Sequence, residues 1–599
     1  MARPESGGSR LEGCVDGLRG KNLPVQTTGR GRESLPGLPA ALVELRDAAR
    51  SAGFGLDIPG ADEARAERDG LVQQVDDYLL PRLASLDAPL LAVVGGSTGA
   101  GKSTLVNSVV GQQVTAASVL RPTTRAPVLV CAPSDRQWFI GDRILPGLAR
   151  TTETPGGPGT LHIVTSAALP AGLALIDAPD IDSVVSENRA LATQLLAAAD
   201  LWVFVTTAAR YADAVPWDLL RGAQRRNAAI GVVLNRVPAE AAVEVPRALQ
   251  AMLAAGGLGE AELFAVADSP RRDGLLPEQE IAPVRDWLQR LAADADARAG
   301  VIRRTLSGAL ADLDRRAQSL ASADAAQGSA AAALAREVED AYASAQGEID
   351  QAVRSGTLLR GEVLARWQEF VGTGELLRSV QATVSRFRDR VVAVVSGRPT
   401  ADNGVQGAVE SEVESLVRAA ADSAAERVVS AWRRDRTGRH LLAGADRELA
   451  RSSPELDERL PAEVRAWQGQ VLDLVREQGA DKRTGARIAS YTVNGAGLAV
   501  MLAVFAQTGG LTGAEVAIAG GTSAAGHKVL EAIFGDQAVR SLAKQARSDL
   551  EKRVAGLLRA EEERFIARIE QARPPSSVDL AVALRTWRSA YAGRAVSTP

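Results

Sequence analysis

Cysteine, histidine and aromatic residues are all scarce in this chain of 599 residues. There are 2 cysteines, Cys14 and Cys131, which lie far apart, and 3 histidines, none of them near a cysteine cluster. We therefore expect neither a disulfide framework nor a zinc site, and the scarcity of cysteine suits a reducing cytoplasm. Aromatic residues make up only 4% of the chain, whereas Ala, Leu, Glu and Arg fill long stretches, and this mixture favours helix.

An excess of positive charge is also lacking. The formal net charge is −4 and the sequence pI is about 5.8, so the chain offers no basic field, and no nucleic-acid partner is expected. The first residues contain no apolar core of signal-peptide length. Residues 1–37 are instead rich in Gly, Arg and Ser, and we predict a disordered tail there.

Short apolar runs alternate with helical stretches between residues 86 and 282. Continuous apolar runs are typical of strands buried on both faces, and their alternation with helices indicates a mainly parallel sheet. We therefore predict an α/β domain of three layers over this range. The expected strands are Leu90–Gly95, Pro127–Ala132, Leu173–Asp177, Leu201–Thr206, Ile230–Asn235 and Leu263–Ala267.

Helical periodicity dominates most of the remaining chain. It covers residues 38–85, before the α/β domain, and residues 283–599, after it, where strand signals stop. We predict that the second range forms a long helical stalk or bundle and that the first range packs with it.

One segment of the predicted stalk is apolar. No charged residue occurs between Ile488 and Ala514, and a second uncharged stretch follows after one glutamate. A bilayer span needs about 20 apolar residues, and Gly509 and Gly510 would break this segment into a hairpin. A membrane-contacting hairpin over residues 488–535 is one interpretation, and a buried hairpin inside a soluble bundle is the other.

The residues Gly96–Ser103 match the phosphate-binding pattern G-x-x-x-x-G-K-[ST]. They follow the apolar run that ends at Gly95 and open a helical stretch, which is the context that the pattern requires. The glycines let main-chain N–H groups face bound phosphates, and Lys102 is placed to reach the β- and γ-phosphates. The expected nucleotide-binding residues of this loop are Gly96, Ser97, Thr98, Gly99, Ala100, Gly101, Lys102, Ser103 and Thr104.

Three oxygen-bearing side chains are candidate ligands for Mg²⁺. Ser103 closes the phosphate-binding pattern, and Asp177 ends an apolar run, where a carboxylate beside the phosphate loop commonly holds the metal through water. Thr124, in the segment Arg121–Pro127, is the candidate switch threonine that reaches the metal and the γ-phosphate from a loop. Its neighbour Thr123 is the close competitor, and a plain loop threonine is the alternative.

These motifs resemble those of the dynamin-like GTPases, including their bacterial members, and more broadly those of the translation-factor class of P-loop GTPases. The resemblance rests on GGSTGAGKST (Gly95–Thr104), TRAPVLV (Thr124–Val130), LIDAPD (Leu175–Asp180) and LNRV (Leu234–Val237). It implies a GTPase domain joined to a helical stalk with a membrane hairpin, and GTP hydrolysis coupled to stalk movement and to membrane binding or remodelling. It also implies lipid as a partner, a homo-oligomer or a paired related GTPase, and a cytoplasmic location, peripheral or inserted at the inner face of the cell membrane.

The sequence departs from the family pattern at three positions. Thr98 stands where dynamins carry a catalytic Gln, and Asp180 stands where the D-x-x-G motif ends in Gly. Pro238 replaces the Asp that pairs with guanine, which leaves Asn235 and Arg236 to contact the base. The resemblance to this family favours GTP as the bound nucleotide, and ATP remains the alternative. The residues expected to act in hydrolysis are Lys102, Thr98 and Thr124.

A second function stays open beside the mechanochemical GTPase. The same three departures suit a soluble regulatory or degenerate P-loop protein that binds GTP or ATP, turns it over little and acts through helical protein contacts. Arg210, in the loop after the apolar run Leu201–Thr206, is either near a nucleotide-dependent dimer face or part of a plain loop. The net negative charge of the chain argues against a ribosome-associated GTPase.

Overall fold

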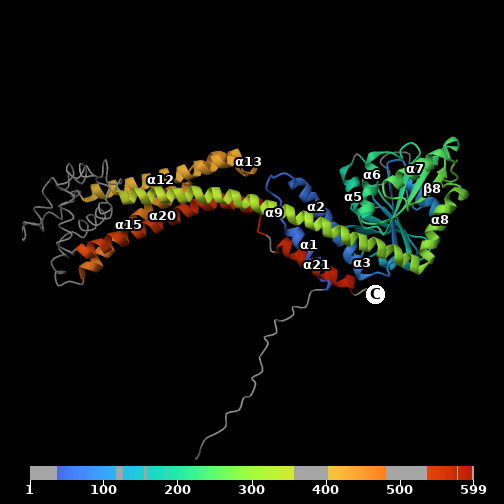
Figure 1. Cartoon of the computed structure of the whole chain (residues 1–599), viewed down its shortest axis with the longest axis horizontal. Helices are drawn as coiled ribbons and strands as arrows, with labels where there is room; N and C mark the ends of the chain where they lie inside the picture. Colours follow the sequence, from blue (N-terminus) through green and yellow to red (C-terminus); the bar gives the residue numbers. More distant parts are fainter. Residues whose placement is uncertain are drawn as a thin grey trace, which may run out of the picture.

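The structure is a computed structural model that describes residues 37–115, 126–153, 157, 159–183, 185–355, 402–480, 536–575 and 578–596. An α/β domain lies at one end, and a long helical stalk extends from it (Figure 1). Three features expected from the sequence fall outside the described residues: the tail over residues 1–36, the switch candidates Thr123 and Thr124, and the apolar segment 488–535.

Eight strands form one sheet, in the order β3-β4-β2-β5-β1-β6-β7-β8. All neighbouring strands run parallel except β2 and β5, which pair antiparallel, so the predicted mainly parallel sheet is confirmed. Each apolar run expected to be a strand is one. The strands are β1 (Leu90–Gly96), β2 (Val128–Cys131), β3 (Ala149–Thr151), β4 (Thr160–Thr165), β5 (Leu173–Asp177), β6 (Leu201–Thr207), β7 (Ala229–Val237) and β8 (Glu262–Ala267).

Strands β3 and β4 were not expected from the sequence. β3 has only 3 residues, none of them buried, and β4 carries His162 among its apolar residues. Both lie beyond β2, at one end of the sheet. β3, at the edge, is too short to form an apolar run, and Thr160, His162 and Thr165 limit the apolar run of β4, so neither strand shows the continuous pattern of the central strands.

Apolar side chains alternate between the two faces of the sheet. Leu91 and Val93 of β1 face one core, and Leu90 and Val94 face the other. Helices cover both faces, so the domain has three layers. Helices α5 (Ser186–Ala197), α6 (Ala214–Arg225) and α7 (Glu244–Ala255) contribute to the first core, and α4 (Lys102–Val110) and α8 (Glu278–Ala293) contribute to the second. Residue 283, from which the stalk was expected to run, lies within α8.

A single long helix, α9 (Ala295–Ser355), runs from the α/β domain along the stalk (Figure 1). Its buried residues recur every three or four positions, as one face of a helix requires. Those from Leu306 to Leu320 join one apolar core, and those from Leu334 to Val353 join another. One helix therefore ties together two successive parts of the stalk.

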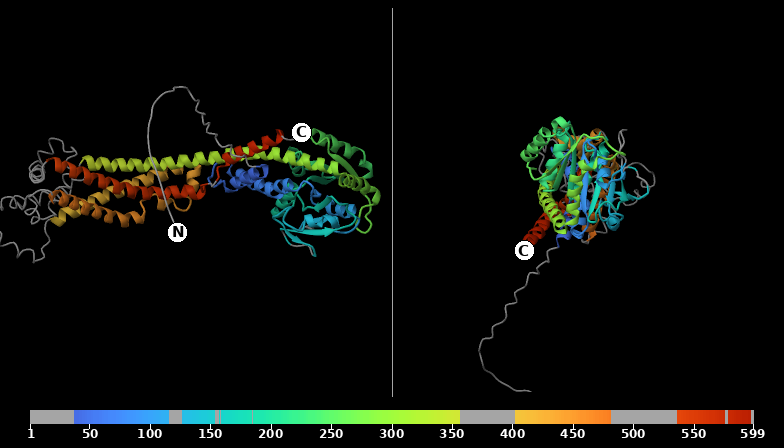
Figure 2. Two further views of the ribbon diagram at one scale, coloured as in Figure 1. Left: turned by 90° about the horizontal axis from the view of Figure 1, so that it is seen from below. Right: turned by 90° about the vertical axis from the view of Figure 1, so that its right-hand side faces the viewer.

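The first part, here called the neck, is built from both ends of the described chain around the beginning of α9. Residues 38–85 pack there with α9 and α21, as Figure 2 also shows. The neck elements are α1 (Leu38–Ser51), α2 (Ala61–Gln74), the π-helical turn η1 (Val75–Leu79), α3 (Leu80–Ala84) and α21 (Leu580–Val596).

The second part, here called the trunk, packs the end of α9 against α12 (Asp402–Arg434), α15 (Pro454–Ala480) and α20 (Asp536–Ala572). Short helices α13 (Arg436–Leu442) and α14 (Asp446–Leu449) follow α12. No helix in the described parts of the chain is both long and apolar enough to cross a membrane. The apolar segment 488–535 is not among the residues to which this finding applies.

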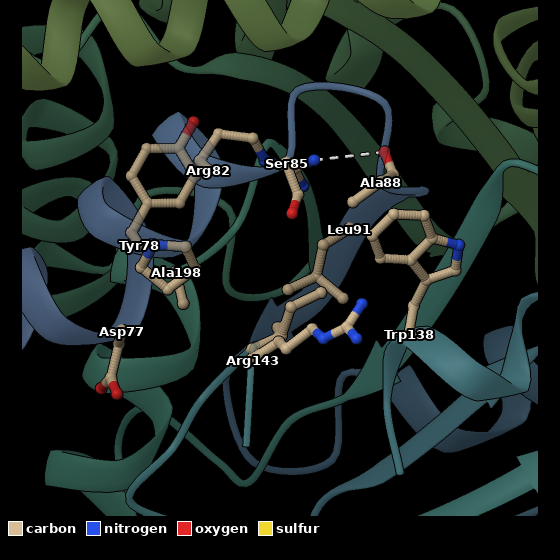
Figure 3. A pocket seen from close by; sticks show the side chains of 11 residues that line it. Asp77, Tyr78, Arg82, Ser85, Ala88, Leu91, Trp138, Arg143 and Ala198 are labelled. Atoms are coloured by element: carbon tan, nitrogen blue, oxygen red, sulfur yellow. Dashed lines mark hydrogen bonds between the residues drawn. The ribbon is translucent and has the colours of Figure 1, made fainter. Parts of the chain in front are cut away.

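The neck meets the α/β domain at the amino-terminal edge of the sheet, around the buried carboxylate of Asp200. Asp200 precedes β6 and forms an ion pair with the buried guanidinium of Arg82 in α3. It also accepts hydrogen bonds from the Tyr78 hydroxyl (3.2 Å) and from the main-chain N–H of Leu91 (2.9 Å). Figure 3 shows Tyr78, Arg82 and Leu91 around a small pocket of about 20 Å³, which has room for one water.

A second junction places α9 against the end of α6. A Cβ atom on Gly308 would lie 1.9 Å from the main-chain oxygen of Arg226, so the two backbones can approach this closely only at a glycine. Gly300, earlier in the same helix, faces open space instead.

We expect Gly308→Ala to weaken the packing of α9 against the α/β domain, because the helix must shift to make room for the methyl group. The expected cost is about 1–3 kcal/mol, measured as a lower midpoint of thermal unfolding. Gly300→Ala is the matched control: it removes backbone freedom without a clash and should stabilise by about 0.4–1 kcal/mol. Equal midpoints for the two variants would contradict the close contact.

We also expect Asp200→Asn to destabilise the junction of neck and domain, because it leaves the buried charge of Arg82 unpaired. Breaking a buried pair in this way costs about 3–5 kcal/mol. The exposed pair of Arg221 with Asp218 provides the control, and Asp218→Asn should cost at most about 1 kcal/mol. Denaturant unfolding measures the free energy of unfolding of both variants. A similar decrease in both would show that the buried ion pair stabilises the protein no more than the exposed one does.

Candidate nucleotide-binding site

The predicted site residues gather at the carboxyl-terminal edge of the sheet. The phosphate loop follows β1, Asp177 is the last residue of β5, and Asn235 lies near the end of β7. These strands lie within the run β5-β1-β6-β7 and are parallel, so their carboxyl ends share one edge. The structure therefore brings together residues that are far apart in the sequence.

The loop Gly96–Gly101 depends on glycine at two close approaches. A Cβ atom on Gly96 would lie 2.1 Å from the main-chain oxygen of Val205 in β6, and one on Gly101 would lie 2.4 Å from Nδ2 of Asn235. Both glycines also have positive φ, 153° and 98°, which side-chain-bearing residues rarely adopt. The loop leads directly into α4, which begins at Lys102. Its partially positive amino end favours an anion.

The ammonium group of Lys102 lies inside this loop and is buried. It donates hydrogen bonds to the main-chain oxygens of Gly96 (2.9 Å) and Ser97 (3.0 Å), and it pairs with the carboxylate of Asp180. Asp180 stands where the family pattern has glycine. The carboxylate therefore supplies the negative charge that a bound phosphate would bring to Lys102.

Asp177 is fully buried beside the start of α4. Its Oδ2 atom accepts hydrogen bonds from the hydroxyls of Ser103 (2.6 Å) and Thr115 (2.7 Å), whereas its Oδ1 atom has no hydrogen-bond partner among the residues that the structure describes. Burial raises the pKa of Asp177, and the hydrogen bonds from Ser103 and Thr115 oppose that shift. An unpaired buried carboxylate oxygen calls for a cation or water.

The donor set at Asp177 and Ser103 fits Mg²⁺, since carboxylate and hydroxyl oxygens are the hard ligands that this ion takes. The described residues include no group of three or more His, Cys, Asp or Glu side chains arranged for a metal. When Mg²⁺ binds together with a nucleotide, phosphate and water usually provide several of its ligands.

A second carboxylate from the same loop, Asp182, occupies the other side of the phosphate loop. Its Oδ1 atom accepts hydrogen bonds from the main-chain N–H (2.6 Å) and the hydroxyl (2.8 Å) of Thr98. Its Oδ2 atom accepts from Nη2 of Arg210 (2.7 Å). Partial burial would raise the pKa of Asp182, but the hydrogen bonds from Thr98 and Arg210 outweigh it and lower the pKa.

Asn235 supports the phosphate loop from the neighbouring strand. It is buried, and its Nδ2 atom donates to the main-chain oxygen of Ala100 (2.8 Å) while its Oδ1 atom accepts from the N–H of Arg236 (2.9 Å). Arg236 is exposed and has a positive φ of 54°, at the point where the pairing of β7 with β8 shifts register. The side chain of Asn235 therefore binds the phosphate loop, whereas the side chain of Arg236 is exposed.

Sequence reasoning named Arg210, near a dimer face or in a plain loop, but it missed the contacts of Thr115 and Asp182 at this site. Thr115 contacts Asp177, and Asp182 joins Thr98 to Arg210. A lone threonine near α4 gives no signal, and the spacing of Asp182 and Arg210 becomes meaningful only when the order of β5, β1 and β6 is known. Thr124 lies outside the described residues, so its expected role stays a prediction.

No family model matches the chain, and no curated protein matches it in sequence. Solved structures do resemble it in fold. One chain of an oligomerised bacterial dynamin pair is 10% identical with a TM-score of 0.39, and the match covers 92% of this chain and 94% of that one. LeoA, a bacterial dynamin GTPase from ETEC, is 11% identical with a TM-score of 0.22, and the match covers 89% and 97%.

Era, solved with MgGDPNP and part of 16S ribosomal RNA, is 17% identical with a TM-score of 0.22, and the match covers 34% of this chain and 56% of that one. Over about nine-tenths of its length, and at low sequence identity, the chain is thus similar to bacterial dynamin structures, the family that its motifs resemble.

Proposed function

We propose that the chain binds a nucleoside triphosphate with Mg²⁺ at the loop Gly96–Ser103 and hydrolyses it, with GTP as the favoured substrate. The observation that carries this proposal is the enclosure of the Lys102 ammonium by the loop beside a buried carboxylate–hydroxyl pair, Asp177 and Ser103. A polyphosphate needs a fixed cation and main-chain donors, and its metal needs hard oxygen ligands.

Each site residue takes a part in this proposal. Gly96–Thr104 hold the phosphates through main-chain N–H groups, and Ser103, Asp177 and Thr124 hold Mg²⁺. When bound, Mg²⁺ supplies positive charge that offsets the charge of the phosphate oxygens. Asn235 braces the loop, and Arg236 stacks on the base. Pro238 offers no carboxylate to guanine, so the choice of GTP over ATP rests on fewer contacts.

Hydrolysis is assigned to Lys102, Thr98 and Thr124. Lys102 stabilises the negative charge on the terminal phosphate, and the two threonine hydroxyls orient the attacking water. A threonine is shorter than the glutamine of the family pattern, so we expect slow turnover.

Binding of a triphosphate requires the loop after β5 to move. The carboxylate of Asp180 forms an ion pair with the ammonium of Lys102. A terminal phosphate bound to the same ammonium would repel this carboxylate. The loop must therefore release Lys102 when nucleotide arrives. This gives a nucleotide-dependent rearrangement next to the site.

The stalk is the element that such a rearrangement would move. The single helix α9 belongs to both the neck core and the trunk core, so a rotation of the neck would carry the trunk with it. We propose that residues 488–535 bring the stalk to a membrane surface at the inner face of the cell membrane. Pairing with a second copy or a related GTPase would complete the working assembly.

A second candidate function is a soluble regulatory protein that holds nucleotide and turns it over little. The pairing of Asp180 with Lys102 favours it, since this carboxylate competes with substrate. Phosphate release separates the two functions. Release no faster than that of a Lys102→Ala variant favours the regulatory protein.

We expect Lys102→Ala to lower Mg²⁺-dependent affinity for GTP by about 10- to 100-fold, because a hydrogen bond to a charged phosphate contributes about 1.5–3 kcal/mol. Titration with a fluorescent GTP analogue measures the affinity, and competition with unlabelled GTP and ATP ranks the bases. Lys544→Ala, on an exposed face of α20, is the control and should bind as the wild-type protein does.

An absence of Mg²⁺-dependent binding of any triphosphate to the wild-type chain would end the proposal. Equal affinity of the wild-type protein and Lys102→Ala would show that the nucleotide lies elsewhere.

We also expect the full chain to sediment with anionic liposomes, and Leu502→Asp to reduce the sedimented fraction, because a charge in the apolar segment opposes insertion. Val243→Asp provides the control, since Val243 is an exposed apolar residue of the α/β domain, 62% accessible. Protein that stays in the supernatant with and without GTP contradicts the membrane role and leaves nucleotide binding untouched.

A further inference from the structure

Arg210 lies in the turn after β6, at the open side of the phosphate loop. Its Nη1 atom donates to the main-chain oxygen of Thr98 (3.2 Å), and its Nη2 atom donates to Asp182 (2.7 Å). Its Nε atom donates to Asp213 (2.8 Å), and the main-chain N–H of Arg210 donates to the oxygen of Thr207 (3.0 Å). The guanidinium is therefore held in a fixed direction, toward the third residue of the loop.

The carboxylate of Asp182 lies in an anion-binding position, here called the seat, which is formed by three hydrogen-bond donors. Two donors come from Thr98, its main-chain N–H and its hydroxyl, and the third comes from Arg210. Thr98 is half-buried and Arg210 is 41% exposed, so the seat opens to solvent and another anion can reach it. Main-chain N–H groups of such a loop are the donors that normally cradle phosphate.

The geometry points to Arg210 as a catalytic residue, supplied by the same chain, that binds the terminal phosphate of the triphosphate after Asp182 leaves its seat. This inference rests on the proposed function, since it assigns a residue to the same reaction. A terminal phosphate brings more charge and more acceptor oxygens than one carboxylate, so it competes well for Thr98 and Arg210. The guanidinium suits it because its planar fork matches phosphate oxygens.

In the reaction, a water oxygen forms a bond to the terminal phosphorus while the bond from that phosphorus to the bridging oxygen breaks. The electron pair of the broken bond stays with the diphosphate, and the water proton passes to the phosphate product. Negative charge spreads over the transferred oxygens and the bridging oxygen in the transition state, and Arg210 offsets it there. This provides the charge stabilisation that the short side chain of Thr98 cannot supply.

Arg210→Ala is the direct test, with Arg221→Ala as the matched control on an exposed ion pair of α6. Single-turnover release of phosphate from GTP is expected to fall by about 10³-fold or more in Arg210→Ala, the lower range for arginines that act on phosphoryl transfer. The affinity for GDP should stay within about twofold, because the diphosphate lacks the contacted group. Arg210→Lys should restore little, since an ammonium lacks the fork.

Two further measurements separate a catalytic role from a structural one. GDP with aluminium fluoride, a stand-in for the transferred phosphate, should bind to the wild-type protein and Arg221→Ala but lose affinity in Arg210→Ala. Asp182→Asn keeps the shape of the seat but removes the competing charge, so it should raise affinity for GTP and leave that for GDP unchanged.

Unchanged hydrolysis in Arg210→Ala with normal GTP binding would overturn the inference, and so would an equal loss of GTP and GDP affinity, which marks a structural residue. If neither the wild-type protein nor Arg221→Ala binds nucleotide, the result instead contradicts the proposed function itself. A wild-type protein that binds GTP and GDP with normal affinity but never releases phosphate would also overturn the role of Arg210.

Discussion

The close approach of β1 to β6 fixes the position of the proposed nucleotide site. The end of β1 lies so near the main-chain oxygen of Val205 that a Cβ atom on Gly96 would come within 2.1 Å of it. The chain must turn there with a backbone that glycine allows, and the loop that follows encloses Lys102. Because β1 lies between β5 and β6, the residues that end β5 stand on one side of the loop, and the turn that carries Arg210 stands on the other. The site is thus a consequence of strand order together with one backbone contact.

The two carboxylates after β5 give this site its particular state. Asp180 pairs with the lysine and Asp182 with the Thr98 N–H and Arg210, so both kinds of donor that would meet a phosphate already hold an anion. These contacts stabilise the loop after β5, and in the proposed function a triphosphate would have to replace both of them to bind. A preference for triphosphate over diphosphate can arise in this way without any contact to the base. Only the triphosphate is long enough to reach both Lys102 and the donors of Thr98 and Arg210.

Sequence patterns predicted the central architecture because the central strands are buried on both faces. Apolar runs marked the central strands β1, β2, β5, β6 and β7 and also the edge strand β8, and glycine, lysine and serine at fixed spacing predicted the phosphate loop. The edge strand β3 has only 3 residues, and polar residues at both ends and His162 near the middle break the apolar run of its neighbour β4, so neither was recognised. The contact of Asp182 with Arg210 was equally invisible, since it joins two loops whose proximity follows from strand order. Local propensity predicts elements, whereas side-chain pairs between loops need the assembled sheet.

A structural connection runs from the loop after β5 to the neck. The helix α5 begins at Ser186, just beyond that loop, and near its other end Gln194 donates a hydrogen bond of 2.6 Å to Asp77 in the π-helical turn η1. The central strands have little freedom to transmit motion, since main-chain pairing fixes β1 to β5 and β6 and since Asp200 anchors their amino-terminal edge to Arg82. The loop itself is held by the side-chain contacts of Asp180 with Lys102 and of Asp182 with Thr98 and Arg210, and by a main-chain hydrogen bond from Ile181 to Gly96 (3.4 Å); in the proposed function, a phosphate would replace the side-chain contacts. In the proposed function, a displacement that begins at the nucleotide would therefore be carried more readily by α5 than by the sheet, and it would arrive at the turn where the neck begins its contact with the domain.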